Sequence, residues 1–223
     1  MKKSVLKSTI SLILSIIIVF SMLFSLSSCG EKNREYDEAE VLSAAENLIK
    51  KSERLNKIYW GEGIIYSPDQ SLANGAYYSA DPESTELLGV NTVDDIINLT
   101  KETFTADYAK IAIDTKLSSV SDEDGIQIYA RYYQKYSALD NSPECIMVYK
   151  NAEIFLKDKC EYDYSTLCID SVKGQSIFVK IAVKVTNPDG ESMTTHAVVE
   201  LIEEENGFRI NTPTYKRYTV GNT

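Results

Sequence analysis

The stretch SIFVKIAVKVTNPDGESMTTHAVVELI, residues 176–202, carries the pattern that decides the fold. Apolar and polar residues alternate on both sides of the turn-forming segment Asn187–Gly190. Alternation with a period of two is typical of a half-buried β-strand, and Pro-Asp-Gly favours a tight turn. The stretch therefore predicts a β-hairpin.

One register of this hairpin places its apolar residues on a single face. If a three-residue loop pairs Asn187 with Glu191, the pairs on that face are Val185–Met193, Val183–Thr195, Ile181–Ala197, Val179–Val199 and Ile177–Leu201. All of these residues except Thr195 are apolar. Because side chains alternate across a strand, we expect this face to join the core and the opposite face, with Lys184 and His196, to meet solvent.

Towards the N-terminus the periodicity changes from that of strands to that of helices. From Asp37 onward, side chains suited to one buried face recur at steps of three and four, and Gly61 and Gly63 then end the pattern. The expected buried positions of this first helix are Val41, Ala45, Leu48, Ser52, Leu55 and Tyr59. Thr92 with Asp95 predicts a capping box at a second helix. Thr105 predicts the cap of a third helix, which runs to about residue 117.

The remaining segments predict strands and the turns between them. Ile126–Tyr136 and Cys145–Leu156 are rich in tyrosine and β-branched residues. Further strands are separated by turn signals at Lys173-Gly174, at Asn187–Gly190 and at Glu205–Gly207. Helices followed by an antiparallel meander predict an α+β fold, with N-terminal helices packed on a curved antiparallel sheet.

The N-terminus has the three parts of an export signal. Lys2, Lys3 and Lys7 precede an apolar run that ends in Leu26-Ser27-Ser28-Cys29. Leu-Ser-Ser-Cys resembles the bacterial lipobox, which implies that Cys29 receives a lipid and that the signal is cut off before it. An uncleaved membrane anchor is the alternative, since about 18 apolar residues can span a bilayer. We expect a signal peptide over 1–28, the lipidated Cys29 with a short linker over 29–36, one α+β domain over 37–218 and a tail over 219–223.

Charge and location agree with a lipid tether. Loss of the three signal lysines changes the formal charge from −10 to −13. Such a surface does not bind nucleic acid, and anionic lipid or wall polymer repels it. We therefore expect the chain on the extracytoplasmic face of a cell membrane, held there by its lipid anchor.

Three cysteines remain after lipidation of Cys29. Cys160 and Cys168 are close enough in sequence to bridge a turn, which makes them a candidate disulfide, while Cys145 is the third thiol. The alternative is that all three stay reduced. A single histidine and the absence of CxxC argue against a metal site, and no cofactor is expected.

The sequence disfavours catalysis and favours binding. His196, the lone histidine, falls on the predicted solvent face, so it cannot serve a buried site as general base, and no catalytic residue is assigned. The acidic cluster Asp122–Gly125 is interpreted as a solvated turn because it lacks further calcium ligands. Aromatic residues suit interfaces, and Tyr59, Trp60 and Tyr66 beside the glycine-flanked loop are the candidate ligand- or partner-binding residues.

The order of elements resembles the nuclear transport factor 2-like superfamily, in which a curved sheet wraps packed helices into a cone. This resemblance covers roughly residues 37–215 and implies a fold that hosts enzymes, binders and scaffolds alike. An enzyme of the isomerase or dehydratase kind, acting on a small molecule in an apolar cone pocket, is therefore the alternative to a binder.

A narrower resemblance rests on Asn56–Gly61 at the end of the first helix and on the Thr92-initiated helix that runs into Phe104-Thr105. These segments look like the secreted inhibitors of cell-wall DL-endopeptidases of Gram-positive bacteria. The resemblance implies a non-catalytic protein that blocks a cysteine hydrolase of peptidoglycan, with that hydrolase or a wall fragment as its partner.

Overall fold

The computed structural model describes residues 36–71, 75–118, 120–121, 127–128, 130–152 and 154–215. All of them belong to the second of the two units into which the chain divides, which spans 35–223. The expected signal peptide, Cys29, the acidic cluster Asp122–Gly125 and the tail over 219–223 lie outside the described residues. None of the helices within the described part is long and apolar enough to cross a membrane.

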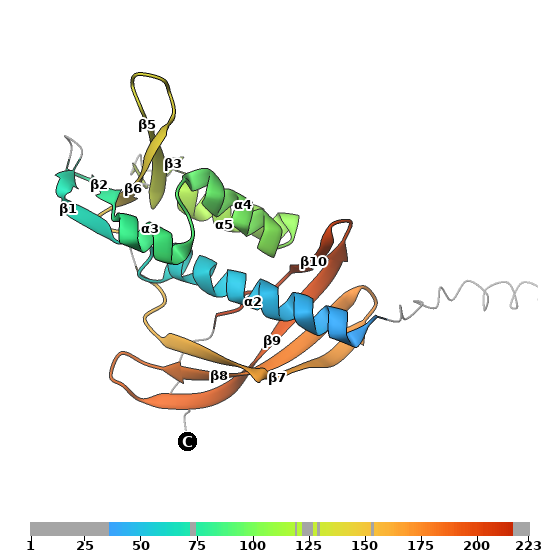
Figure 1. Ribbon diagram of the computed structural model, residues 1–223. Coiled ribbons are helices and arrows are strands. Elements are labelled where there is room, and N and C mark those ends of the chain that lie inside the picture. Colours follow the sequence, from blue (N-terminus) through green and yellow to red (C-terminus); the bar gives the residue numbers. More distant parts are fainter. Residues whose placement is uncertain are drawn as a thin grey trace, which may run out of the picture. The chain divides into compact units, whose positions relative to one another are not determined.

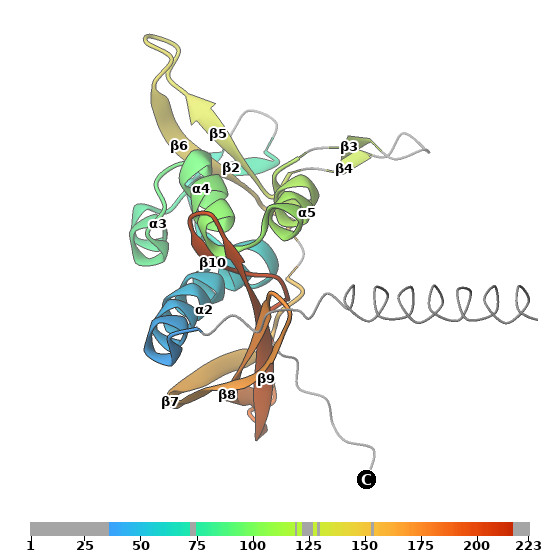
Figure 2. The same cartoon turned by 90° about the vertical axis from the view of Figure 1, so that its right-hand side faces the viewer.

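Helices and antiparallel sheets together make an α+β fold (Figures 1 and 2). The elements in chain order are α2 (Glu38–Trp60), β1 (Tyr66–Ser71), β2 (Tyr77–Ala80), α3 (Pro82–Leu88), α4 (Val93–Thr103), α5 (Ala106–Leu117), β3 (Val120–Ser121), β4 (Gln127–Ile128), β5 (Tyr132–Tyr136), β6 (Pro143–Tyr149), β7 (Lys159–Lys173), β8 (Ser176–Thr186), β9 (Ser192–Glu204) and β10 (Gly207–Ile210).

The described strands form two four-stranded sheets and a short ribbon, where the sequence predicted one continuous meander. The N-terminal sheet has the order β1-β2-β6-β5, the C-terminal sheet has the order β10-β9-β8-β7, and β3 pairs with β4. The division falls after β6, because the predicted strand Cys145–Leu156 ends at Tyr149 and an irregular connector over 150–158 follows. Strands β1 and β2 and helix α3 were not predicted within the turn-rich stretch before residue 90.

The predicted register of the β8–β9 hairpin is confirmed at every pair. Ile177 lies opposite Leu201, Val185 opposite Met193, and all pairs between them agree. The Asn187 N–H donates to the Glu191 carbonyl at 2.9 Å, which closes the expected loop. The five β8 side chains of the predicted core face are fully buried, whereas His196 on the other face is exposed.

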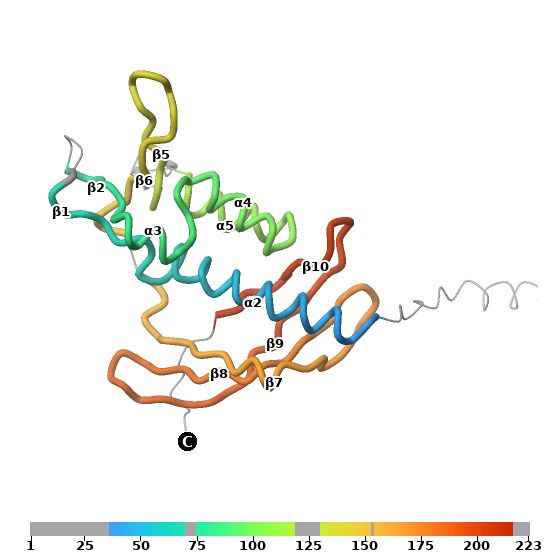
Figure 3. Tube along the Cα trace, viewed as in Figure 1, coloured from blue at the N-terminus to red at the C-terminus, as the bar shows by residue number. Residues whose placement is uncertain are grey.

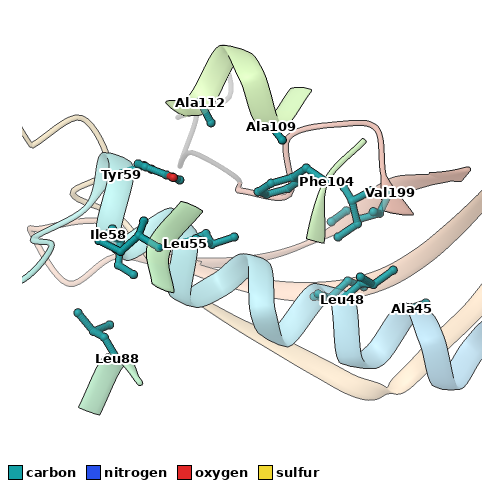
Figure 4. Packing of buried hydrophobic residues seen from close by; sticks show 14 of the residues in the cluster. Ala45, Leu48, Leu55, Ile58, Tyr59, Leu88, Phe104, Ala109, Ala112 and Val199 are labelled. Carbon is teal, nitrogen blue, oxygen red and sulfur yellow. The ribbon is translucent and has the colours of Figure 1, made fainter. Parts of the chain in front are cut away.

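Helix α2 packs its predicted stripe against the C-terminal sheet and α4 (Figure 3). All six predicted positions of that stripe are buried. The core that results also takes in Phe104, Ala109, Ala112 and Val199 (Figure 4). Burial of this apolar surface, at about 25 cal/mol per Å², is the main stabilising contribution to the fold.

The cap predicted at Thr92 has the expected chemistry, and the cap predicted at Thr105 does not. Asp37 caps α2 by accepting from the Ala39 N–H at 2.9 Å. The capping box of α4 is complete: Thr92 accepts from the Asp95 N–H, and the Asp95 carboxylate accepts from the Thr92 N–H. Thr105 precedes α5 as expected, but its side chain accepts from no N–H of that helix, and its hydroxyl donates to Asn211 Oδ1 at 2.9 Å.

We predict that Ile181→Ala lowers the free energy of unfolding by about 2–5 kcal/mol, because Ile181 is fully buried and the substitution leaves a cavity. Thr194→Ala, on the exposed face of the same hairpin, should change it by no more than about 0.5 kcal/mol. Urea unfolding of both variants checks this, and equal losses would contradict the assignment of faces.

Candidate partner-binding surface

The C-terminal end of α2 carries the aromatic pair that the sequence singled out. Tyr59 lies in the core with 0% of its surface exposed, and its hydroxyl donates to Thr100 Oγ1 at 2.6 Å, since Thr100 itself donates to the Ile96 carbonyl. In this position Tyr59 cannot contact a partner. Trp60 is partly buried, and its ring packs against the rings of Tyr59 and Tyr215 at centroid distances of 5.4 and 5.6 Å. Its main contacts are therefore within the protein.

Arg131 and Tyr132 hold the last carbonyls of α2. The buried guanidinium of Arg131 donates to the Tyr59 carbonyl at 3.0 Å and to the Gly61 carbonyl at 2.6 Å. The Tyr132 hydroxyl donates to the Ile58 carbonyl at 2.8 Å and accepts from the Ile64 N–H at 3.1 Å. Burial raises the pKa of Tyr132, so its hydroxyl keeps the proton that it donates. A cation at a helix C-terminus also interacts favourably with the helix dipole.

The connector after β6 completes this arrangement. The N–H groups of Phe155 and Leu156 donate to the Trp60 carbonyl at 2.9 and 2.7 Å. The predicted strand Cys145–Leu156 stops at a turn after Tyr149, and these two N–H groups beyond the turn bond to the helix end and not to a neighbouring strand. We call Arg131, Tyr132, Phe155 and Leu156, together with the carbonyls of residues 58–61, the α2 clamp.

Tyr66, the third candidate, lies at the start of β1 and is partly buried. Its ring packs against that of Tyr78 on β2, with the centroids 4.9 Å apart. Both Tyr66 and Trp60 pack against the core, and the ring contacts of the described residues do not join Tyr66 to Tyr59 or to Trp60.

The β5–β6 hairpin is the most prominent projection of the described residues (Figures 1 and 2). Leu139 at its tip has 99% of its surface exposed, and Tyr136 beside it has 48%. The sequence pattern predicted ordinary strands at β5 and β6 and gave no candidate site in the loop between them. A leucine inside the turn-forming stretch Ser137–Pro143 was the signal that could have identified it.

Hydrogen bonds within the loop fix the shape of this tip. Ser137 N–H donates to the Ser142 carbonyl at 2.9 Å, and Asn141 N–H donates to the Ser137 carbonyl at 3.0 Å. The Asp140 carboxylate accepts from both the hydroxyl and the N–H of Ser142, which lowers the pKa of Asp140. Asn141 has φ +57°, a left-handed conformation that asparagine tolerates better than most residues. The tip therefore presents Leu139 in an ordered loop.

The candidate groups for acid–base chemistry lie either on the surface or in hydrogen bonds within the fold. His196 is exposed on β9 as predicted, and the hydroxyls of Tyr59 and Tyr132 are held by Thr100 and the Ile58 carbonyl. Among the described residues, every buried side-chain nitrogen or oxygen has a hydrogen-bond partner.

One carboxyl between α2 and β7 does have a shifted pKa. Burial raises the pKa of Glu53, and the hydrogen bond from the Tyr164 hydroxyl at 2.6 Å offsets only part of this shift. The nearby charges of Lys57 and Lys50 also lower it, and the Lys50 ammonium lies 4.9 Å from the centre of the Tyr164 ring. This cluster joins the helix to an edge strand.

The candidate disulfide Cys160–Cys168 is wrong. The two cysteines form no disulfide with each other and lie on the same strand, β7, where Cys160 pairs with Val185 and Cys168 pairs with Lys180 of β8. Five residues of β8 separate these partners, which at about 3.4 Å per residue is roughly 17 Å. A disulfide requires Cα atoms within about 7 Å. Cys145 forms no disulfide with either of them in the part of the chain that the structure describes.

Comparison with known proteins gives no relative. No family model, no curated protein and no solved structure matches the chain. The geometry of the described residues therefore has to support any functional assignment.

We predict that Gly63→Ala disrupts the α2 clamp. A Cβ at Gly63 would lie 2.2 Å from Tyr132 Oη and 2.5 Å from Arg131 Nη2, so both donors would have to move. Gly190 is the matched control, because it also has a positive φ but has no atom within 4 Å of its added Cβ. Gly190→Ala should cost about 1–2 kcal/mol of unfolding free energy, and Gly63→Ala at least about 3 kcal/mol. Denaturant unfolding measures both, and similar losses would show that the clamp contributes little.

We predict that Glu53 makes the protein less stable as pH rises above the ordinary carboxyl value of 4.5. The folded pKa is raised, so in that window the folded state still binds the proton that the unfolded chain has released, and unfolding becomes easier with rising pH. Glu53→Gln should remove this decrease. Tyr164→Phe should enlarge it, because the hydrogen bond that favours the charged form is lost. Urea midpoints from about pH 4 to about pH 7 check both variants, and parallel curves for wild type and Glu53→Gln would contradict the prediction.

Proposed function

We propose that the chain is a non-catalytic binding protein that inserts its β5–β6 hairpin into the cleft of a partner enzyme. The observation that carries this proposal is the ordered, projecting tip with Leu139 almost completely exposed. A preorganised loop loses little conformational entropy when it binds, and an apolar side chain that fills a pocket contributes strongly to affinity. A convex element of this kind suits the concave active site of another protein.

The proposed partner is a cell-wall hydrolase of the DL-endopeptidase type. Support comes from the resemblance of Asn56–Gly61 and of the Thr92-initiated helix to inhibitors of these enzymes. Charge adds a second argument, since an enzyme that works on an anionic wall polymer benefits from a cationic surface. An inhibitor with a formal charge of −13 is complementary to such a surface, which favours fast association.

The proposed location is the outer face of the cell membrane of a Gram-positive bacterium, where a lipoprotein is anchored through Cys29. The basic head, apolar run and Leu26–Cys29 support this proposal. A lipid tether would concentrate the domain where newly made wall is cleaved. Anchoring would also explain how an acidic protein stays at an acidic surface.

The proposed kinship with the nuclear transport factor 2-like superfamily concerns α2, α4, α5 and the C-terminal sheet. Helices that precede a twisted antiparallel sheet and pack on one of its faces are consistent with that architecture. In this interpretation the N-terminal sheet, which carries the projecting hairpin, is an addition to the cone.

The decisive experiment titrates the full mature chain, in detergent, against a purified DL-endopeptidase that digests peptidoglycan. We predict stoichiometric inhibition, weakened on the order of 10- to 100-fold by Leu139→Ala. Leu87→Ala is the matched control, because Leu87 on α3 is 84% exposed but does not lie on the hairpin. It should inhibit like the wild type.

Two outcomes would contradict the proposal, one for the identity of the partner and the other for the contact surface. If the wild-type chain does not inhibit at micromolar excess, the hydrolase is not the partner. If Leu139→Ala and Leu87→Ala both inhibit like the wild type, the chain is an inhibitor but the hairpin is not its contact surface. Thermal unfolding of both variants shows whether either substitution acts through stability.

A further inference from the structure

One carboxylate connects the two sides of the β5–β6 tip. Asp140 is the one charged residue of the tip, residues 137–142. Its Oδ1 accepts from the Ser142 N–H at 3.1 Å and from the Ser142 hydroxyl at 2.8 Å. On the other side, the Leu139 N–H donates to Ser137 Oγ at 3.2 Å, and the Ser137 hydroxyl is in turn hydrogen-bonded to the Asp140 carboxylate. Asp140 is therefore joined to residues before and after Leu139.

Leu139 is held by these side chains and not by the bonds that close the loop. The two backbone hydrogen bonds of the tip join Ser137 to Ser142 and Asn141 to Ser137, and neither includes Leu139. The described hydrogen bond of the Leu139 N–H runs to Ser137 Oγ, which Asp140 orients. Hydrogen bonds to an ionised acceptor are stronger than neutral ones, and bonds that follow one another polarise each other.

An exposed leucine in a loop tip needs such a restraint. Loop tips are the preferred sites of proteolytic cleavage, and the rate of cutting follows the population of the opened form. We propose that Asp140 is the positioning residue of the contact surface: its carboxylate holds Leu139 in the conformation that binds, and keeps the tip from opening into a form that a hydrolase cuts. This inference rests on the proposed function and adds how the inserted tip stays intact.

The opposite role for Asp140 is direct contact with a cationic group of the partner. The carboxylate already accepts from both serines, which favours the role within the tip. Asp140→Asn separates the two roles, because the amide oxygen accepts the same two bonds from Ser142 but carries no charge. Asp140→Ala removes both the bonds and the charge.

The first test needs no partner. The full mature chain in detergent is treated with a protease that cuts beside leucine, and mass spectrometry follows cleavage at Leu139. We expect Asp140→Ala to be cut there roughly 3- to 10-fold faster than the wild type, and Asp140→Asn at nearly the wild-type rate. Asp189→Ala is the matched control, since Asp189 lies in the β8–β9 loop, whose described backbone hydrogen bonds join Asn187 to Glu191 and Gly190. If Asp140→Ala is cut no faster than this control, the proposal is overturned.

The second test repeats the titration against the DL-endopeptidase. Asp140→Ala should weaken inhibition by roughly 3- to 10-fold, and Asp140→Asn should restore it. Equal weakening by both variants would show that the charge contacts the partner, and the positioning role would be wrong. If the wild type does not inhibit, the proposed function fails together with the binding half of this inference, while the cleavage rates still decide whether Asp140 holds the tip. Thermal unfolding of each variant shows that the rest of the fold is unchanged.

Discussion

The C-terminal end of α2 depends on hydrogen bonds from residues far away in the chain. A helix leaves its last four carbonyls without partners, and a buried unpaired carbonyl costs about 1–3 kcal/mol. Here the carbonyls of residues 58–61 each accept from the α2 clamp. The clamp draws on the start of β5 and on the connector between β6 and β7. Both sheets are thereby attached to the end of the same helix.

The parts of the fold that could be predicted are those whose cause is local. The β8–β9 register follows from alternation and one turn within residues 176–202, and the structure agrees at every pair. The buried stripe of α2 and the capping box at Thr92 likewise depend on residues within a few positions of each other. In each case a short segment contains both the signal and the interaction that it predicts.

The parts that could not be predicted depend on partners distant in sequence. Arg131 donates to a carbonyl 72 residues away, and a basic residue between strand-like neighbours gives no local sign of burial. Phe155 and Leu156, which the predicted strand included, lie beyond the turn after Tyr149 and donate to the end of α2. The predicted disulfide between Cys160 and Cys168 was wrong for a related reason, because the seven residues between them do not form a turn but belong to strand β7. The candidate contact surface also differs from the predicted one. It lies at the exposed loop with Leu139 and not at Tyr59, which is buried, and the only local indication of this loop was one leucine among turn-forming residues.

The α2 clamp also connects the core to the proposed contact surface. Tyr132 is both the first residue of β5 and a donor to the end of α2, so the base of the projecting hairpin is fixed by the interaction that completes the helix. Hydrogen bonds within the tip then fix Leu139 relative to that base. A binding element held at both ends has little freedom left to lose when it meets a cleft. The hydrogen bonds of the buried Arg131 and Tyr132 therefore fix the orientation of the hairpin as well as the end of α2.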